Sequence, residues 1–323
     1  MDRGDRTERL PATAIGAAAL IAAVWGFNFV VIKIGVSAVP PLMLAALRFL
    51  FCVLPAIFFV RRPAAPMGRI AAYGLFLGVG EFGFLFTAIK LGAPSGLSSI
   101  LLQAQAFFTA ILASVFLGER LKARSAIGMA VAAAGLALFA FAPGGSHGGS
   151  PVGGTSGLTP LLLGMILLAA LGWAFANVEA RRMPGVNALG LMVWSSLFSP
   201  LPLAALSLAF EGKEALAASF SSIGWLTVGA LAYLVLLSTL LGYGLWNGLI
   251  MRYGASRIAP FSLMVPVFGL ASASLVLGES FGPRDALGAA LILAGLLVHA
   301  LNGRGAASSG HRTRRASGGS ATP

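Results

Sequence analysis

An arginine and a glutamate lie inside segments of the chain that are otherwise almost wholly apolar. Arg48 lies twelve residues before Val60, and Glu81 lies twelve residues after Arg69. If Val60 and Arg69 mark the same edge of a lipid bilayer, both charges lie about 18 Å from it, at ~1.5 Å per residue. Charged residues at such depth are costly and often mark substrate or proton pathways. We interpret them as a titratable pair that binds a zwitterion or exchanges a proton. A static ion pair, or an arginine satisfied by carbonyl groups and water, is the structural alternative.

Aromatic and amide side chains share one helical face in two other apolar segments. Trp25 and Phe29 are four residues apart, with Asn28 three residues beyond Trp25, and Trp173 and Asn177 repeat the spacing of four. A ring that contacts the apolar part of a small solute, beside an amide that binds its polar head, is typical of ligand pockets. Tryptophan also anchors helices at membrane interfaces. Both tryptophans lie in the middle of their segments, which favours a cavity lining.

A third apolar segment carries polar and aromatic residues at helical spacing. These cavity candidates are Thr239, Tyr243, Trp246 and Asn247.

A fourth segment places Ser99 and Gln103 on one face. Gln105 points about 160° away from Gln103, because an α-helix turns ~100° per residue. We therefore predict that at most one of the two glutamines faces a cavity, and both are candidates. Internal prolines bend helices, so Pro260 and Pro266 predict a hinge.

The elements that must position these residues are membrane-spanning helices. Of the 323 residues, 58% are hydrophobic and only 10% are charged, whereas soluble domains carry about 25% charged residues. A spanning helix needs about 20 mostly apolar residues. Ten segments meet this requirement: 12–35, 40–60, 69–90, 94–117, 123–142, 159–180, 187–209, 222–251, 255–278 and 284–302.

The formal net charge of +12 could indicate nucleic-acid binding, but the basic residues cluster between the apolar segments. Of the 22 Lys and Arg, 17 fall on the side that holds the N-terminus, four fall on the other side, and Arg48 lies within a segment. The positive-inside rule therefore predicts that both termini are cytoplasmic. We expect a lipid bilayer, and no nucleic acid, as the partner.

An internal repeat divides the chain into halves. LGERLKARSAIGMAVAAAGL (117–136) matches LGESFGPRDALGAALILAGL (277–296) at ten of twenty positions. Each half holds five segments, so the halves must enter the membrane with opposite sense. Many secondary transporters have such inverted repeats, with a substrate site near the membrane midplane. The sequence thus predicts an all-α polytopic membrane protein of ten transmembrane helices in two inverted five-helix repeats.

The expected domain order follows from these segments. A cytoplasmic N-terminal tail (1–11) precedes the first repeat (12–142). A Gly- and Ser-rich flexible periplasmic linker (143–158) leads to the second repeat (159–302) and a disordered, basic cytoplasmic tail (303–323).

Sequence motifs typical of enzymes and of metal or nucleotide sites are missing. Cys52 is the only cysteine, the three histidines are scattered, and no phosphate-binding loop or hydrolase motif occurs. We expect no metal, no cofactor and no enzymatic activity. A membrane enzyme or a scaffold remains the alternative of another class.

Several stretches carry a resemblance to a known family. They include WGFNFVVIKIG (25–35), LLQAQAFFTAIL (101–112), GYGLWNGLIMRYG (242–254) and APFSLMVPVFGLASA (259–273). The chain resembles EamA-type transporters of the drug/metabolite transporter superfamily, and among them most closely the bacterial exporters of O-acetylserine and cysteine. The resemblance implies a multi-pass protein of the bacterial inner membrane that exports small amino-acid metabolites. Aromatic amino acids, amines or drugs are the alternative cargo, and the oligomeric state stays open.

Overall fold

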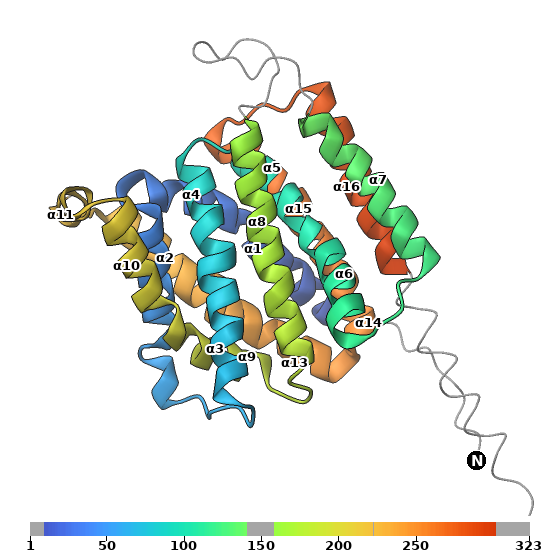
Figure 1. Cartoon of the computed structure of the whole chain (residues 1–323), viewed down its shortest axis with the longest axis horizontal. Coiled ribbons are helices and arrows are strands. Elements are labelled where there is room, and N and C mark those ends of the chain that lie inside the picture. The colour runs from blue at the N-terminus through green and yellow to red at the C-terminus, as the bar shows by residue number, and fades with distance from the viewer. Residues whose placement is uncertain (1–9, 141–157, 222, 302–323) are drawn as a thin grey trace, which may run out of the picture.

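The computed structural model describes residues 10–140, 158–221 and 223–301 (Figure 1). All regular elements in these residues are helices, and no strand occurs among them. The predicted tails and linker lie outside the described residues, except for Leu10, Pro11 and Leu158.

The first half of the chain forms seven of the labelled helices. They are α1 (Ala12–Ala38), α2 (Pro41–Val53), α3 (Met67–Leu75), α4 (Phe84–Lys90), α5 (Ser95–Leu101), α6 (Gln105–Leu117) and α7 (Ala123–Ala140).

The second half follows the same plan with more breaks. Its helices are α8 (Pro160–Arg181), α9 (Ala188–Ser195), α10 (Pro200–Phe210), α11 (Lys213–Ser221), α12 (Trp225–Ala232), α13 (Gly242–Tyr253), α14 (Ala255–Ile258), α15 (Val265–Leu277) and α16 (Pro283–Leu301).

Local sequence explains several helix boundaries. The Thr159 hydroxyl accepts a hydrogen bond from the Leu162 amide at 3.3 Å, and Pro160 takes the first helical position of α8. The Asn187 side chain caps α9 by accepting hydrogen bonds from two backbone amides, at 2.8 and 3.2 Å.

Short segments of other helix types join the α-helices within single spans. π-helices connect α3 to α4 (Phe76–Gly83) and α12 to α13 (Tyr233–Leu241). 3-10 segments connect α5 to α6 (Leu102–Ala104) and α14 to α15 (Ala259–Met264). The two π-helices lie in corresponding spans of the two halves, and so do the two 3-10 segments.

The helices have the lengths and the surface of a membrane protein. Among the described residues, nine helical spans are long and apolar enough to cross a bilayer, and α9 with α10, bent by 42°, forms a tenth. Large apolar side chains point outward, including Phe59, Leu201 and Leu275, which are 83, 81 and 86% exposed. Such a surface is matched to lipid hydrocarbon rather than to water. The predicted count of ten spans is confirmed.

The two repeats are visible in the helix boundaries. At an offset of 160 residues, α6 corresponds to α15 at both ends. Gly118 and Gly278 end these two helices in the same left-handed conformation, with φ of 68° and 66°. Glycine is favoured there because a side chain strains this conformation.

The helices α7 and α16 lie side by side at one edge of the bundle (Figure 1). A methyl group added at Gly128 would lie 2.6 Å from the Gly295 oxygen, and one at Gly135 would lie 2.7 Å from the Gly288 oxygen. Small residues allow such close backbone approach in membranes. At the offset of 160, Gly128 corresponds to Gly288 and Gly135 to Gly295, so each glycine meets the counterpart of the other. This crossed pairing requires antiparallel helices, as inverted repeats demand.

Candidate functional site

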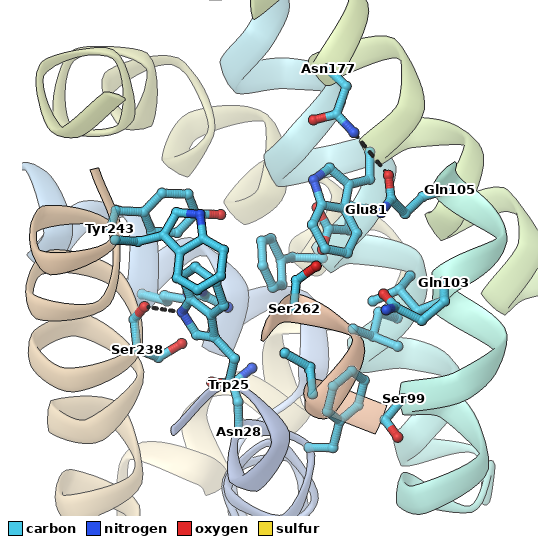
Figure 2. A pocket seen from close by; sticks show the side chains of 18 of the residues that line it. Trp25, Asn28, Glu81, Ser99, Gln103, Gln105, Asn177, Ser238, Tyr243 and Ser262 are labelled. Atoms are coloured by element: carbon cyan, nitrogen blue, oxygen red, sulfur yellow. Dashed lines mark hydrogen bonds between the residues drawn. The ribbon is translucent and has the colours of Figure 1, made fainter. Parts of the chain in front are cut away.

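A cavity of about 340 Å³ lies between the two halves of the bundle. Figure 2 shows side chains from α1, α6, α8 and α13 converging on it. Twelve of the fourteen predicted cavity residues line it, drawn from segments as far apart in sequence as Trp25 and Trp246. The twelve are Trp25, Asn28, Phe29, Arg48, Glu81, Ser99, Gln103, Gln105, Trp173, Asn177, Tyr243 and Trp246.

Glu81 reaches the cavity from the π-helical part of the third span. Gly80 lies against Gly172 of α8 so closely that a methyl group on Gly172 would be 2.5 Å from the Gly80 carbonyl carbon. This contact holds the backbone of Glu81 against α8, and Glu81 is only 4% exposed. π-helical turns are rare and often occur at functional sites.

Arg48 enters the same cavity from α2. Its Nη2 donates a hydrogen bond to the Thr239 hydroxyl at 3.1 Å, and its Cζ lies 3.8 Å from the centre of the Phe82 ring. The residue is 2% exposed. A cation over an aromatic face is stabilised by the ring quadrupole, so protein groups compensate part of the charge.

Arg48 and Glu81 line one cavity without bonding to each other. Within residues 10–140, 158–221 and 223–301 no salt bridge joins them. Three of the residues that line the cavity have buried atoms without a hydrogen-bond partner in the same part of the chain: Nε and Nη1 of Arg48, Oε2 of Glu81, and Oδ1 of Asn28. The static ion pair is therefore absent from this structure, and these unpartnered atoms belong to residues that line the cavity.

One wall of the cavity is aromatic. Trp25 donates a hydrogen bond from Nε1 to the Ser238 oxygen at 2.9 Å, which fixes the indole. Its ring centre lies 5.6 Å from that of Tyr243 and 5.1 Å from that of Trp246. Figure 2 shows Trp25 and Tyr243 on the side of the cavity opposite Gln103 and Gln105.

The opposite wall is formed by amides. Asn177 donates to Gln105 Oε1 at 2.9 Å and to the Thr109 hydroxyl at 3.2 Å. Gln103 and Gln105 both line the cavity, so the prediction that at most one glutamine faces it is wrong. The 3-10 turn Leu102–Ala104 turns ~120° per residue, which brings the two side chains to about 120° apart instead of 160°.

Two predicted residues lie off the cavity lining. Thr239 binds Arg48 and donates to the Leu234 oxygen five residues back, at 2.7 Å. Asn247 lies near Asn187 and Met251. The π-helix Tyr233–Leu241 has more residues per turn than an α-helix, so the face computed with the α-helical period is displaced at Thr239. Ser238 takes the place of Thr239 in the lining.

The predicted hinge prolines lie at helix breaks. Pro260 lies in the 3-10 segment Ala259–Met264, and Pro266 lies in the first turn of α15. Motion about them stays a prediction.

The structure adds seven residues to the lining that the sequence analysis missed. They are Tyr73, Phe82, Leu85, Leu102, Ser238, Ser262 and Val265. Helical spacing from Glu81 would have found Leu85, four residues on. The repeat offset of 160 would have found Val265 from Gln105.

Sequence relationships agree with this architecture. A family model described as "EamA-like transporter family" matches residues 12–141 and again residues 161–301. The chain belongs to the EamA-like transporter family. Membership accounts for the two repeats and makes the chain a multi-pass membrane transporter, as expected from its resemblance to the family.

Curated relatives of this EamA-like transporter carry a more specific description. The chain is 42% identical over 306 residues to a "Probable amino-acid metabolite efflux pump" of Salmonella typhimurium, covering 93% of this chain and 97% of the relative. It is 41% identical over 289 residues to the protein of the same description from Escherichia coli, covering 87% and 93%.

A solved crystal structure shares the fold of this EamA-like transporter. The similarity has a TM-score of 0.58 at 19% identity and covers 90% of this chain and 97% of that one. At this identity the likeness supports the fold alone.

Proposed function

We propose that this EamA-like transporter exports small amino-acid metabolites such as O-acetylserine and cysteine across the bacterial inner membrane by alternating access. The observation that carries the proposal is the pair of buried, oppositely charged groups that line one cavity without bonding to each other. The descriptions of the two relatives above 40% identity support the same class of cargo.

The two charged groups match the two charges of an α-amino acid. The substrate carboxylate would accept hydrogen bonds from Nε and Nη1 of Arg48, in the planar geometry that guanidinium groups offer carboxylates. The substrate ammonium group would lie between Glu81 and Asn28, whose free oxygens are acceptors. Binding would therefore satisfy polar atoms that are costly to leave unpaired in a buried site.

The remaining lining suits a short polar or apolar side chain. A cavity of about 340 Å³ is at the small end of ligand pockets, which span ~300–1,000 Å³. The amides of Gln103, Gln105 and Asn177 could bind an ester or thiol group, while the rings of Trp25 and Trp246 exclude water.

A second cargo class has a specific observation in its favour. Seven aromatic side chains line the cavity, and they include Trp25, Trp173 and Trp246. Aromatic amino acids or amines could stack on these rings. The zwitterion-binding groups would serve an aromatic amino acid equally well, so the choice rests on size.

Transport assays with Arg48→Lys test the proposal. Lysine keeps the charge but lacks the planar pair of donors. We expect purified variant protein in liposomes to transport radiolabelled cysteine and O-acetylserine with an apparent affinity about 10 to 100 times weaker, the equivalent of losing one hydrogen bond to a charged group, ~1.5–3 kcal/mol. Arg69→Lys is the matched control, because Arg69 is 42% exposed and forms a peripheral ion pair with Glu179.

Two outcomes would contradict the proposal. Unchanged affinity of the R48K variant would remove Arg48 from substrate binding. Competition by tryptophan as strong as that by cysteine would replace the small cargo with the aromatic one.

A further inference from the structure

The repeat-related glutamates Glu119 and Glu279 have different partners in this structure. Each follows the glycine that ends its helix, and each donates its backbone amide to an alanine oxygen at 3.3 Å. Their local backbones are thus equivalent. Their carboxylates lie at opposite ends of the bundle, which we call the Glu119 face and the Glu279 face.

At the Glu279 face, the carboxylate joins the two halves of the protein. Its two oxygens accept hydrogen bonds from the backbone amides of Ser95 and Gly96, at 2.7 and 2.9 Å, where α5 begins. Gly96 is so close to Phe281 that an added methyl group would lie 2.6 Å from the ring. The helix α5 packs along α15 at this face, so the cavity is closed there.

At the Glu119 face, the part of the chain that the structure describes forms no corresponding connection. The counterpart of the Ser95 helix start is Ala255, where α14 begins, but Glu119 forms an ion pair with Arg181 instead, at 2.8 Å. Both members of this pair are about half exposed, at 53 and 47%. Leu121, the counterpart of the packed Phe281, is 44% exposed.

The cavity opens toward the Glu119 face. Asn177, one turn before Arg181, lines the cavity and is partly exposed, as are Gln105 and Trp246. By contrast Ser99, which lies toward the Glu279 face, is 1% exposed. The glutamate that is paired with an arginine therefore lies at the open end of the cavity, and the glutamate that binds a helix start lies at the closed end.

The alternative partner of Glu279 can also be located. Trp25 and Trp173 correspond at an offset of 148 residues, which pairs Lys33 with Arg181. In this structure Lys33 donates to the Ile89 oxygen at 3.1 Å. Each glutamate thus has two candidate partners. One is a basic residue of its own face, and the other is the first turn of a helix from the opposite half of the protein.

We propose that Glu119 and Glu279 are positioning residues that exchange partners as the transporter alternates between its two open states. In the opposite state Glu119 leaves Arg181 and caps α14, which closes its face. Glu279 releases α5 and pairs with Lys33, which opens the Glu279 face. Inverted repeats make this exchange symmetric, because each half adopts the conformation that the other half has now. The inference rests on alternating access, not on the identity of the cargo.

A cysteine reporter at Ser95 can follow the exchange. Ser95 is fully buried, and its hydroxyl has no hydrogen-bond partner among the described residues. Ser95→Cys is therefore a small change that a maleimide reaches only when the Glu279 face opens. Cys52 is also fully buried, and labelling of the parent chain supplies the background. The reagent is applied to purified full-length protein without substrate.

The variants should change this labelling in opposite directions. E279A removes the cap on α5 and should raise the labelling rate about fivefold, the size expected from the loss of one helix N-cap. R181A frees Glu119 and should also raise the rate. Adding E119A to R181A should lower it again about fivefold, because the opposite state then lacks its own cap. E214A is the control, since Glu214 is 80% exposed and its ion-pair partner is the neighbouring, similarly exposed Lys213.

The effect of E119A distinguishes the exchange of partners from a local loosening of the Glu279 face, because Glu119 lies at the end of the bundle away from the reporter. A rate that is equal or higher in the R181A/E119A variant than in R181A would overturn the exchange, even if E279A loosens its own face. Elution of each variant as a single species on size exclusion shows that the fold is intact, and E279Q replaces E279A if that variant aggregates. Failure of the R48K transport test would leave these labelling rates unchanged, so the two proposals fail separately.

Discussion

Glu81 is held in place by backbone packing rather than by an ionic partner. The close contact of Gly80 with Gly172 and the π-helical turn direct its carboxylate into the cavity, where Oε2 has no partner among the described residues. Buried carboxylates in membrane proteins often take part in proton relays. We therefore assign Glu81 a second proposed role, in which it binds the substrate ammonium group when ionised and releases it when protonated.

Glu81→Gln tests this role. Glutamine has nearly the same shape but cannot ionise, so export by the variant should not depend on pH and should not respond to an imposed proton gradient. In the parent chain, the apparent affinity should weaken as the pH falls, because a protonated Glu81 no longer attracts an ammonium group. The measurement is substrate flux in liposomes at a series of pH values. The same pH dependence in E81Q as in an E214Q control would exclude Glu81 as the coupling group.

At the scale of the elements, interrupted helices bring the polar residues together. The π-helices of the third and eighth spans carry Glu81 and Ser238 into the cavity, and the 3-10 turn of the fourth span turns Gln103 and Gln105 to the same side. Glycines permit the close helix contacts that hold these interruptions. The exposed polar backbone that such breaks create is tolerated in a membrane only where it lies within protein or faces a cavity.

Gly172→Ala tests the contact between α8 and the third span. The added methyl group would lie 2.5 Å from a backbone carbon of Gly80, which cannot move aside as a side chain could. We expect a loss of about 1–3 kcal/mol in stability and a lower transport rate, because Glu81 is displaced. Thermal unfolding in detergent measures the first effect.

The matched control lies on the same helix. A methyl group at Gly164 meets nothing within 4 Å, so Gly164→Ala should leave the unfolding temperature unchanged or raise it slightly. Equal unfolding temperatures for the G172A and G164A variants would show that the close contact contributes no strain.

At the scale of the whole molecule, two antiparallel copies of one helical plan surround the cavity. The crossed glycine pairs of α7 and α16 join the repeats along one edge. Even numbers of spans place both chain ends on one side of the membrane, and the charge distribution predicts that this side is the cytoplasm.

Labelling of introduced cysteines tests that topology. In intact cells with a permeable outer membrane, a membrane-impermeant maleimide should leave Thr7→Cys and Ser309→Cys unmodified until the inner membrane is opened. It should modify Ser150→Cys at once, because the linker is predicted to be periplasmic. Modification of the T7C and S309C variants from opposite sides would contradict the inverted arrangement.

Much of this protein follows from its sequence alone. The ten spans, the repeat and twelve of the cavity residues were predictable because lipid demands long apolar helices, so a polar side chain inside one requires a reason. These signals are local or periodic, and no knowledge of neighbouring helices is needed to detect them.

Only the tertiary structure decided how the polar residues meet. The separation of Arg48 from Glu81, the binding of Thr239 to Arg48 and the orientation of both glutamines depend on π and 3-10 turns. Such turns are stabilised by contacts between helices rather than by local sequence, so the α-helical period could not reveal them. The different partners of Glu119 and Glu279 have the same origin: their local sequences match, and the packing of the two halves alone sets them apart.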